Sequence, residues 1–257
     1  EISACLVGSE MCIRDRESRE RQSQLVADAG HELKTPLTSL RTNIELLMMA
    51  SKNPSDTITP DDIADLEHDV MSQLEELTNL VTDLVDLARE DSQHSVVEPI
   101  DLGEILDGVI DRVRRRRLDI KFTFNLIDWY LMGDQRGLSR AFLNVLDNAA
   151  KWSPENGTVT MTMQQIDDDR VEITVDDEGP GIPADERELV FERFYRSVES
   201  RAMPGSGLGL AIVKQVMESH GGSVRAEESP RGGTRMVLEL PGGPQITSNN
   251  NEAMRIS

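Results

Sequence analysis

Apolar residues recur at alternating spacings of four and three over residues 26–47, which is the periodicity of an amphipathic helix with a coiled-coil seam. The segment 51–60 breaks this pattern with two prolines, and nearly the same spacing returns over residues 63–88. Thr59, followed by Pro60 and two acidic residues, forms a helix start signal. The pattern therefore predicts an antiparallel pair of long helices. Since a lone hairpin buries little surface, we expect two copies to form a four-helix bundle, although a passive coiled-coil spacer would show the same pattern.

The pattern changes after residues 91–101, a segment that carries a proline and breaks the heptads. Beyond it, helical spacing is interspersed with strict alternation, most plainly over residues 158–163 and 170–175, where half-buried strands are expected. The mixture predicts an α/β sandwich with helices on one face of a mixed sheet, so the chain as a whole is an α+β multidomain protein. Helices are predicted at 102–117, 134–152, 185–194 and 207–220, and strands at 121–127, 129–132, 158–166, 170–176, 222–229 and 234–240.

Both ends of the chain are unlike the rest. Residues 242–257 are polar and weakly patterned, which predicts a disordered tail. Leu6–Arg16 reads LVGSEMCIRDR, the translation of a transposase-type sequencing adapter, so residues 1–16 are interpreted as a non-native segment. Cys5 and Cys12 lie within it, with no histidine near enough to suggest a metal site. On this interpretation the natural N-terminus is missing.

Charge narrows the set of partners. The formal net charge of -20 argues against direct binding to nucleic acid or to an anionic membrane surface. Arg114–Arg117 form a local basic cluster, which we interpret as the solvated last turn of a helix, with a phosphate or lipid site as the alternative. Because no apolar run approaches the roughly 18 residues needed to span a bilayer, we expect a soluble chain.

His31 is the first candidate for chemistry. Two residues along a helix correspond to about 200°, so His31 points away from Leu33 and the seam. Glu32 is adjacent and could orient the imidazole or take a proton, and Pro36 is expected to bend the helix just beyond it. This segment alone leaves open whether His31 is a packed residue, a metal ligand or a nucleophile, although no second histidine lies one turn away.

A second candidate site lies on the predicted helix 134–152. Asn144, Asn148 and Lys151 are spaced by four and three, which places them on one helix face. Amide oxygens beside a cation suit a hydrated Mg²⁺ that bridges phosphates, although a solvated helix face would show the same residues.

Two glycine-rich segments follow. In DDEGPGIP, residues 176–183, an acid at a strand end precedes two glycines where a ligand could approach the backbone. In GSGLGLAIVKQV, residues 205–216, a Gly-x-Gly-x-Gly loop opens onto a helix whose N–H groups and dipole suit phosphate. The loop is neither a Walker loop nor part of a dinucleotide-binding unit.

The order of these segments, with FERFYR at 191–196 between the two glycine segments, resembles the sensor histidine kinases of two-component signalling. HELKTPL is similar to their H box, LNVLDNAAKWS to the N box, DEGPGIP and GSGLGLAIV to the two glycine boxes, and FERF to the F box. The resemblance covers roughly residues 20–241. It implies a dimerisation and histidine phosphotransfer domain at 17–90, a linker at 91–101 and a catalytic ATP-binding domain of the Bergerat type at 102–241.

The resemblance also implies roles in catalysis. His31 would be the phosphoacceptor that attacks the γ-phosphate of ATP through its neutral Nε2, and Glu32 would act as base or orienting group. Thr35 would position water for dephosphorylating the partner, which makes the protein a kinase and a phosphatase. His220 lies outside the boxes near a helix end, where we expect a structural role.

The remaining implied roles concern the nucleotide. Asp177 would accept a hydrogen bond from the adenine amino group and so select ATP over GTP. Asn148, with Asn144, would hold Mg²⁺. Further contacts to the nucleotide, including a mobile lid around the F box, are implied for Lys151, Trp152, Gly179, Gly181, Phe191, Phe194, Gly205, Gly207 and Gly209.

The implied partners are a second copy of the chain and a response regulator whose receiver domain takes the phosphoryl group on an aspartate. The parent protein would be anchored in the plasma membrane by a missing N-terminal region, with this part on the cytoplasmic side. Two alternatives remain: another ATPase of the same nucleotide-binding fold, and a catalytically weak dimeric docking scaffold.

Overall fold

The computed structural model describes residues 29–30, 33–34, 36–49, 59–90, 96–197 and 205–245. The chain divides into two compact units, residues 1–94 with 202–206 and residues 95–201 with 207–257. The proposed adapter segment 1–16 and most of the predicted tail lie outside the described residues.

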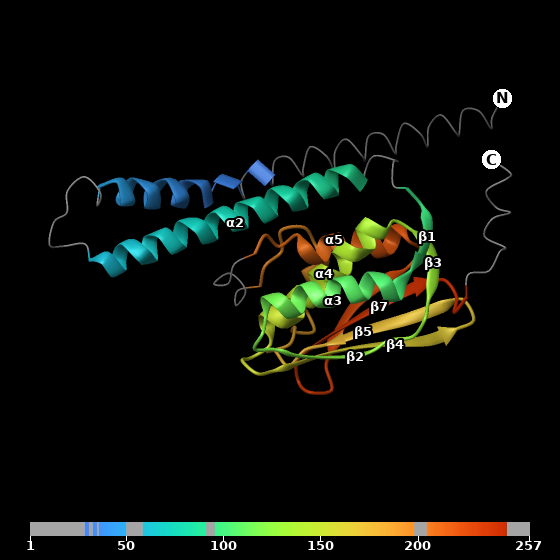
Figure 1. Cartoon of the computed structure of the whole chain (residues 1–257). Coiled ribbons are helices and arrows are strands. Elements are labelled where there is room, and N and C mark those ends of the chain that lie inside the picture. The colour runs from blue at the N-terminus through green and yellow to red at the C-terminus, as the bar shows by residue number, and fades with distance from the viewer. Residues whose placement is uncertain are drawn as a thin grey trace, which may run out of the picture. The chain divides into compact units, whose positions relative to one another are not determined.

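The described part of the first unit is a helical hairpin, in which residues 36–49 run beside helix α2, Pro60–Glu90 (Figure 1). The helix α2 starts at the predicted signal. The Thr59 backbone N–H and hydroxyl each donate to Asp62 Oδ2 at 2.8 Å, and the Asp62 N–H donates back to Thr59 Oγ1 at 3.2 Å. This reciprocal capping box satisfies N–H groups that a helix start leaves unpaired. The predicted hairpin is confirmed.

The two helices of the hairpin are joined by a hydrogen bond from Gln73 Nε2 to Ser39 Oγ at 2.9 Å. Both helices nevertheless leave large apolar side chains exposed to solvent. Two of them on each helix belong to the predicted seam, namely Leu37 and Ile44, and Leu74 and Val81.

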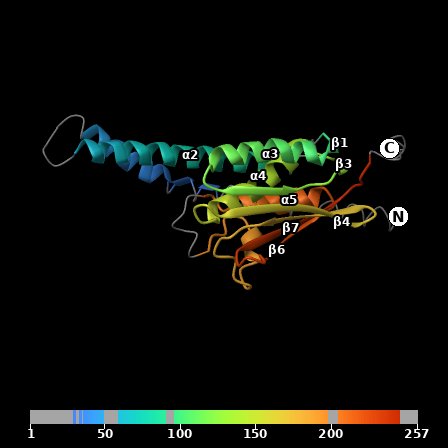
Figure 2. The same cartoon turned by 60° about the horizontal axis from the view of Figure 1, so that its bottom comes forward.

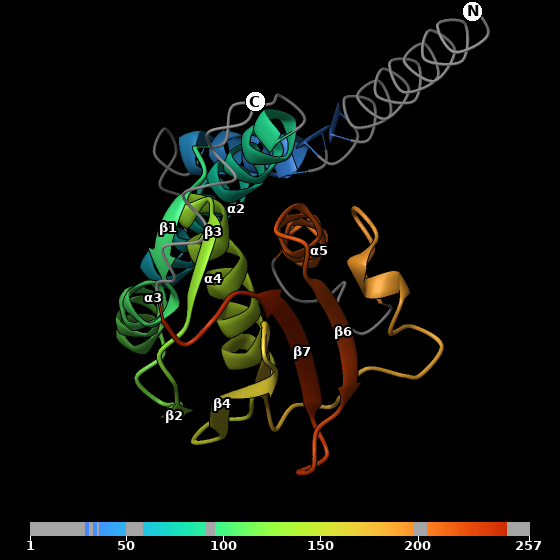
Figure 3. The same cartoon turned by 90° about the vertical axis from the view of Figure 1, so that its right-hand side faces the viewer.

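The second unit has two layers, three helices over one face of a five-stranded sheet (Figures 1 and 2). The strand order is β2-β4-β5-β7-β6, with β2 and β4 parallel and all other pairs antiparallel. Viewed along the sheet, α4 and α5 lie above the strands (Figure 3). The predicted sandwich with a mixed sheet is confirmed. Its elements are α3 Leu102–Arg116, α4 Gln135–Trp152, α5 Gly209–Ser219, β2 Lys121–Asn125, β4 Thr158–Asp167, β5 Arg170–Asp176, β6 Ser223–Glu228 and β7 Thr234–Pro241.

The core lies between these layers because the strands alternate. In β5, Val171, Ile173 and Val175 are buried under the helices, while the residues between them lie on the other face. Helix α4 supplies the matching apolar stripe, with Phe142 fully buried at its centre.

The predicted strand at 129–132 is present as β3, Tyr130–Gly133, and it pairs with two short segments where the sequence indicated no strand. Strand β1, Glu98–Asp101, lies inside the predicted linker and pairs antiparallel with β3. Gly243, in the predicted tail, exchanges two backbone hydrogen bonds with Tyr130, at 2.8 and 2.9 Å. Neither segment alternates, so only the partner strand defines them.

The prediction of a helix at 185–194 is wrong. The chain there forms turns and one short 3₁₀ helix, η1, Leu189–Phe191. Phe191 is buried, and Phe194 takes a left-handed backbone conformation with φ of 62°. The tertiary contacts of these two residues override a local preference for helix, which is only a weak determinant.

The arginine cluster at the end of α3 has partners within its own unit. Arg116 forms an ion pair with Asp147 at 2.7 Å, and the Arg114 guanidinium lies 5.0 Å from the Phe124 ring centroid. These contacts favour the helix-end interpretation over a phosphate or lipid site.

Candidate nucleotide-binding site

The predicted asparagine face of α4 is present. The helix starts at Asp134, whose side chain accepts from the Arg136 N–H, and its apolar side is buried against the sheet. Asn144 and Asn148 are therefore both half-buried, one turn apart, on the opposite side. Asn144 Nδ2 donates to the Gly209 carbonyl oxygen at 3.1 Å, which links α4 to the first residue of α5.

The two asparagines can be tested as ligands of Mg²⁺. The donated bond uses only the Asn144 nitrogen, so Oδ1 is left to face a cation, and among the described residues the Asn148 amide has no hydrogen-bond partner. No group of three or more His, Cys, Asp or Glu side chains suited to a metal occurs in the described residues. Amide oxygens fit a Mg²⁺ that takes its other ligands from phosphate and water.

The C-terminal end of α4 meets the first glycine box. Lys151 Nζ lies 5.3 Å from the centroid of the Trp152 ring, within the range of a cation–π interaction. A Cβ added to Gly179 would lie 2.8 Å from the Trp152 carbonyl oxygen, so only glycine allows this approach. The structure thus brings Lys151, Trp152 and Gly179 together from segments far apart in the sequence.

Asp177, directly after β5, is the most constrained acid of the site. Its side chain is buried at 5% exposure, and Oδ1 accepts from the Gly179 and Thr234 N–H groups, at 2.8 Å each. Its own N–H donates to the Thr234 carbonyl oxygen at 2.9 Å. Burial raises the pKa of Asp177, and the hydrogen bonds from Thr234 and Gly179 oppose this shift. The other carboxylate oxygen, Oδ2, receives neither of these two backbone bonds.

Thr234 and Gly233 are site residues that the sequence analysis missed. Besides its bonds to Asp177, Thr234 is itself buried. A Cβ on Gly233 would collide with the Asp177 carbonyl oxygen and lie 2.5 Å from its Oδ1. In the sequence, these residues stand out only as Gly-Gly-Thr at the start of a predicted strand. That signal does not point to Asp177, because the two segments come together only through the pairing of β7 with β5.

The F box and the second glycine box are in direct contact. The Phe194 N–H donates to the Gly207 carbonyl oxygen at 3.0 Å. Gly207 has φ of 70°, and a Cβ there would lie 2.9 Å from the Phe194 backbone. Gly205 has φ of 148°, and Gly209 is the first residue of α5, whose N-terminus has no side-chain cap. An uncapped helix start is suited to phosphate.

Gly181, in the first glycine box, has φ of 79° and lies beside the turn that contains Gly233. Phe191 is buried at the end of η1. His220 has the predicted structural role: its Nε2 accepts from the Asp134 N–H at 2.9 Å, and its Nδ1 lies 2.7 Å from the Val216 carbonyl oxygen. His220 thereby ties the end of α5 to the start of α4.

Three residues of the H box were assigned roles in catalysis, namely His31, Glu32 and Thr35. All three lie outside the described residues, so these roles stay predictions. Residues 33–34 and 36–49 around them are helical. No helix among the described residues is long and apolar enough to cross a membrane.

Two family models match the chain. Residues 133–244 match "Histidine kinase-, DNA gyrase B-, and HSP90-like ATPase", and residues 21–93 match "His Kinase A (phospho-acceptor) domain". The segments 27–48, 148–154 and 201–216 also indicate a likeness to the kinase MprB within this family.

Comparisons with individual proteins confirm that likeness. The chain is 58% identical over 237 residues to the signal transduction histidine-protein kinase/phosphatase MprB of Mycobacterium leprae, covering 90% of this chain and 46% of that relative. It is 55% identical to MprB of Mycobacterium avium, covering 89% of this chain and 44% of the relative. The chain thus spans less than half the length of the curated relatives it matches.

Among solved structures, the chain is similar to the mycobacterial sensor histidine kinase MprB, with 52% identity and a TM-score of 0.55 over 58% of this chain and 100% of that one. It is also similar to the histidine kinase ThkA in complex with the response regulator protein TrrA, with 25% identity and a TM-score of 0.66. That match covers 90% of this chain and 66% of the other.

Proposed function

Since the chain belongs to the sensor histidine kinases, with a phosphoacceptor domain followed by an ATPase-type domain, we propose that it binds ATP in its second unit and transfers the γ-phosphate to His31. The observation that carries this proposal is the constellation around Asp177. One unit of the fold brings together a buried acid, two amide side chains on α4 and the glycine-rich start of α5.

Nucleotide recognition rests on Asp177. With Oδ1 fixed by two backbone N–H groups, Oδ2 accepts a hydrogen bond from the exocyclic amino group of adenine. Guanine carries a carbonyl oxygen at the corresponding position, which would meet the carboxylate as a second acceptor. The site therefore selects ATP over GTP.

The phosphates lie toward the start of α5. Backbone N–H groups at Gly207 and Gly209 and the N-terminal dipole of α5 hold their negative charge, and Lys151 adds a cation. Asn148 and Asn144 hold Mg²⁺, which supplies charge neutralisation on the phosphates when bound.

Phosphoryl transfer asks the protein mainly for positioning and charge neutralisation. The Nε2 lone pair of His31 forms a bond to the γ-phosphorus, while the bond from that phosphorus to the bridging oxygen breaks and ADP leaves with the electron pair. Glu32 orients the imidazole or takes the proton from its other nitrogen. The phosphoryl group then passes to an aspartate of a response regulator, and Thr35 positions the water that later removes it from that partner.

The hairpin of the first unit is proposed to dimerise. Exposed apolar side chains of the predicted seam lie seven residues apart on both helices, at Leu37 and Ile44 and at Leu74 and Val81, which is the heptad spacing of a coiled coil. Two copies would bury these side chains in a four-helix bundle. The complete protein is proposed to be anchored in the plasma membrane with this part on the cytoplasmic side.

Incubation with γ-labelled ATP and Mg²⁺ tests the proposal. We expect the chain to acquire phosphate that is labile to acid and stable to base, and His31→Gln to abolish it. His68→Gln is the matched control, because His68 is an exposed histidine of α2 and should leave the labelling unchanged. Absence of label on the unaltered chain, or equal label on His31→Gln, contradicts the proposal.

A further inference from the structure

Glu178, the residue after Asp177, joins three segments of the second unit. Its Oε2 accepts from the N–H of Thr158, the first residue of β4, at 3.0 Å. Its Oε1 accepts from Arg231 Nη1 at 2.9 Å. These two contacts lower the pKa of Glu178, so it is a carboxylate at neutral pH. Glu178 lies in the first glycine box, whereas Arg231 lies in the turn between β6 and β7, outside every motif of the sequence analysis.

The turn that carries Arg231 is ordered by its own hydrogen bonds. The Ser229 N–H donates to the Gly233 carbonyl oxygen at 2.8 Å, and the Gly232 N–H donates to the Ser229 carbonyl oxygen at 2.9 Å. The same turn leads directly into Gly233 and Thr234, the two residues in contact with Asp177. Arg231 is therefore close in sequence to Gly233 and Thr234, which contact Asp177. Glu178 is the direct neighbour of Asp177 along the chain.

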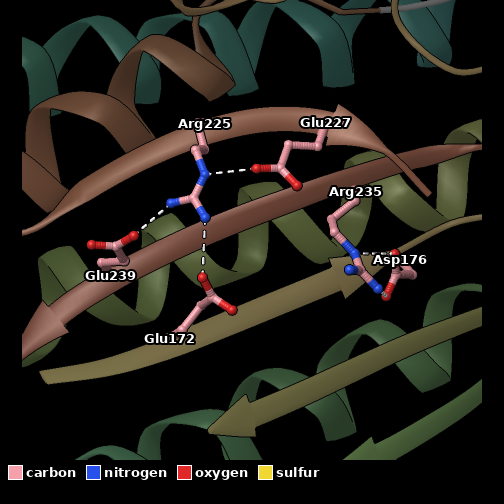
Figure 4. Close-up of polar contacts among 6 residues, drawn as sticks. All are labelled: Glu172, Asp176, Arg225, Glu227, Arg235 and Glu239. Atoms are coloured by element: carbon pink, nitrogen blue, oxygen red, sulfur yellow. Dashed lines mark hydrogen bonds and ion pairs between the residues drawn. The ribbon is translucent and has the colours of Figure 1, made fainter. Parts of the chain in front are cut away.

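The pairing of β5 with β7 ends at Asp176 and Arg235, before this turn is reached. On the outer face of the sheet, Asp176 and Arg235 are register partners joined by two hydrogen bonds of 2.7 and 2.8 Å (Figure 4). That pair holds the strands up to Asp177. Beyond it, the loop after β5 contacts the β6–β7 turn through the bonds and packing of Asp177 and through Gly181, which lies beside Gly232 and Gly233. The Glu178–Arg231 ion pair joins the loop to the turn itself at 2.9 Å, whereas the Arg187–Glu228 pair at the end of β6 is longer, at 3.9 Å.

We propose that Glu178 and Arg231 are positioning residues for Asp177, and that their ion pair sharpens the selectivity for adenine over guanine. The inference rests on the proposed function, since it concerns the base-reading end of the same nucleotide site. The pair closes the loop and the turn around Oδ1 of Asp177, which fixes the direction of Oδ2. On this proposal Glu178 and Arg231 act through Asp177 and make no contact of their own with the nucleotide.

The selectivity argument follows from which nucleotide uses Oδ2. ATP gains a hydrogen bond only while Oδ2 keeps its direction, and hydrogen bonds weaken steeply with misalignment. GTP gains nothing from this oxygen. Loosening the pair therefore weakens ATP binding and does not weaken GTP binding, since guanine presents a second acceptor to this oxygen. Because Arg231 is 60% exposed, the expected effect is modest, an increase of about fivefold in the Kd for ATP.

The test is calorimetric titration of Arg231→Gln, Glu178→Gln and Arg231→Lys with ATP and with GTP in Mg²⁺. Both glutamine variants should lose about fivefold in the ratio of the two Kd values, and Arg231→Lys, which keeps a cation for Glu178, should recover most of it. Arg225→Gln is the matched control. Arg225 pairs with Glu172, Glu227 and Glu239 on the outer face of the same sheet, so its loss should lower the melting temperature and leave the ratio unchanged (Figure 4).

The outcomes separate the two proposals. If the unaltered chain does not bind ATP, the proposed function fails and this inference fails with it. If the unaltered chain prefers ATP while Arg231→Gln and Glu178→Gln keep its ratio, or weaken ATP and GTP equally, the pair has no positioning role and only this inference is overturned. If a glutamine variant does not fold, Arg231→Lys still tests the inference. A ratio of the two Kd values far below that of the unaltered chain would contradict the argument that a cation at position 231 is sufficient.

Discussion

Replacing Asp177 with asparagine is expected to change stability and nucleotide binding in opposite directions. Asparagine keeps a carbonyl oxygen at the Oδ1 position, so the hydrogen bonds from the Gly179 and Thr234 N–H groups can persist. At the Oδ2 position it places an NH₂ group, which is a donor. The adenine amino group is also a donor, so the proposed hydrogen bond is lost.

The cost in binding follows from the kind of bond removed. A hydrogen bond to a charged acceptor contributes about 1.5–3 kcal/mol. At 1.4 kcal/mol for each factor of ten, Asp177→Asn should weaken ATP binding by about 10- to 150-fold. GTP binding should not weaken and should gain, because the asparagine NH₂ can donate to the guanine carbonyl oxygen, which the carboxylate met as a second acceptor.

The effect on stability has the other sign. Burial raises the pKa of Asp177 above its ordinary value of 3.8, so the folded chain binds this proton more tightly than the unfolded chain. The free energy of unfolding therefore falls as pH rises from about 3.8 through the raised pKa, and at neutral pH the ionised carboxylate costs folding free energy. Asp177→Asn removes that cost. Its free energy of unfolding at neutral pH should equal or exceed that of the unaltered chain.

Calorimetric titration with ATP and urea unfolding followed by tryptophan fluorescence measure the two effects. Both tryptophans, Trp129 and Trp152, belong to the second unit, so the fluorescence reports on the unit that contains Asp177. Asp177→Ala is the control. This variant leaves the Gly179 and Thr234 N–H groups unpaired, so its free energy of unfolding should fall by about 1–3 kcal/mol for each group. It should also lose ATP binding. ATP binding by Asp177→Asn within twofold of the unaltered chain would refute the assignment of Asp177 to the adenine.

Three further substitutions test other parts of the unit. Gly207→Ala forces a side chain onto a φ of 70° and against the Phe194 backbone, so it should lose more than about 1 kcal/mol in urea unfolding and weaken ATP binding; unchanged values would contradict the F-box contact. His220→Ala should lose about 1 kcal/mol, seen as a lower melting temperature, because the Asp134 N–H at the start of α4 loses its acceptor; an equal melting temperature would count against this tie. Phe142→Ala should lose about 3–5 kcal/mol of unfolding free energy, and a loss below 1 kcal/mol would mean that Phe142 is not at the core.

The elements that the sequence predicted well are those whose local pattern and tertiary environment agree. Alternation over residues 170–175 marks β5, because every second side chain enters the core. The Thr59–Asp62 capping box marks the start of α2, because the residues that form it are neighbours along the chain. The spacing of Asn144 and Asn148 was enough to place both on one side of α4.

The elements that it missed depend on partners far along the chain. Strand β1 is four residues long and exists through its pairing with β3. The segment 185–194 has a helical composition, but burial of Phe191 and the bond from Phe194 to Gly207 determine its conformation. Local propensity carries no information about either contact.

The candidate site shows the same division at the level of single residues. Asp177 stands out in the sequence because a glycine box surrounds it, yet the groups that fix its carboxylate come from two places. Gly179 is two residues away, whereas Thr234 and Arg231 reach the site only through the pairing of β5 with β7. A motif therefore locates the residue that is proposed to read the base, and the pairing of β5 with β7 supplies the groups that hold its carboxylate. Selectivity for adenine should accordingly respond to changes in the β6–β7 turn, where no motif draws attention.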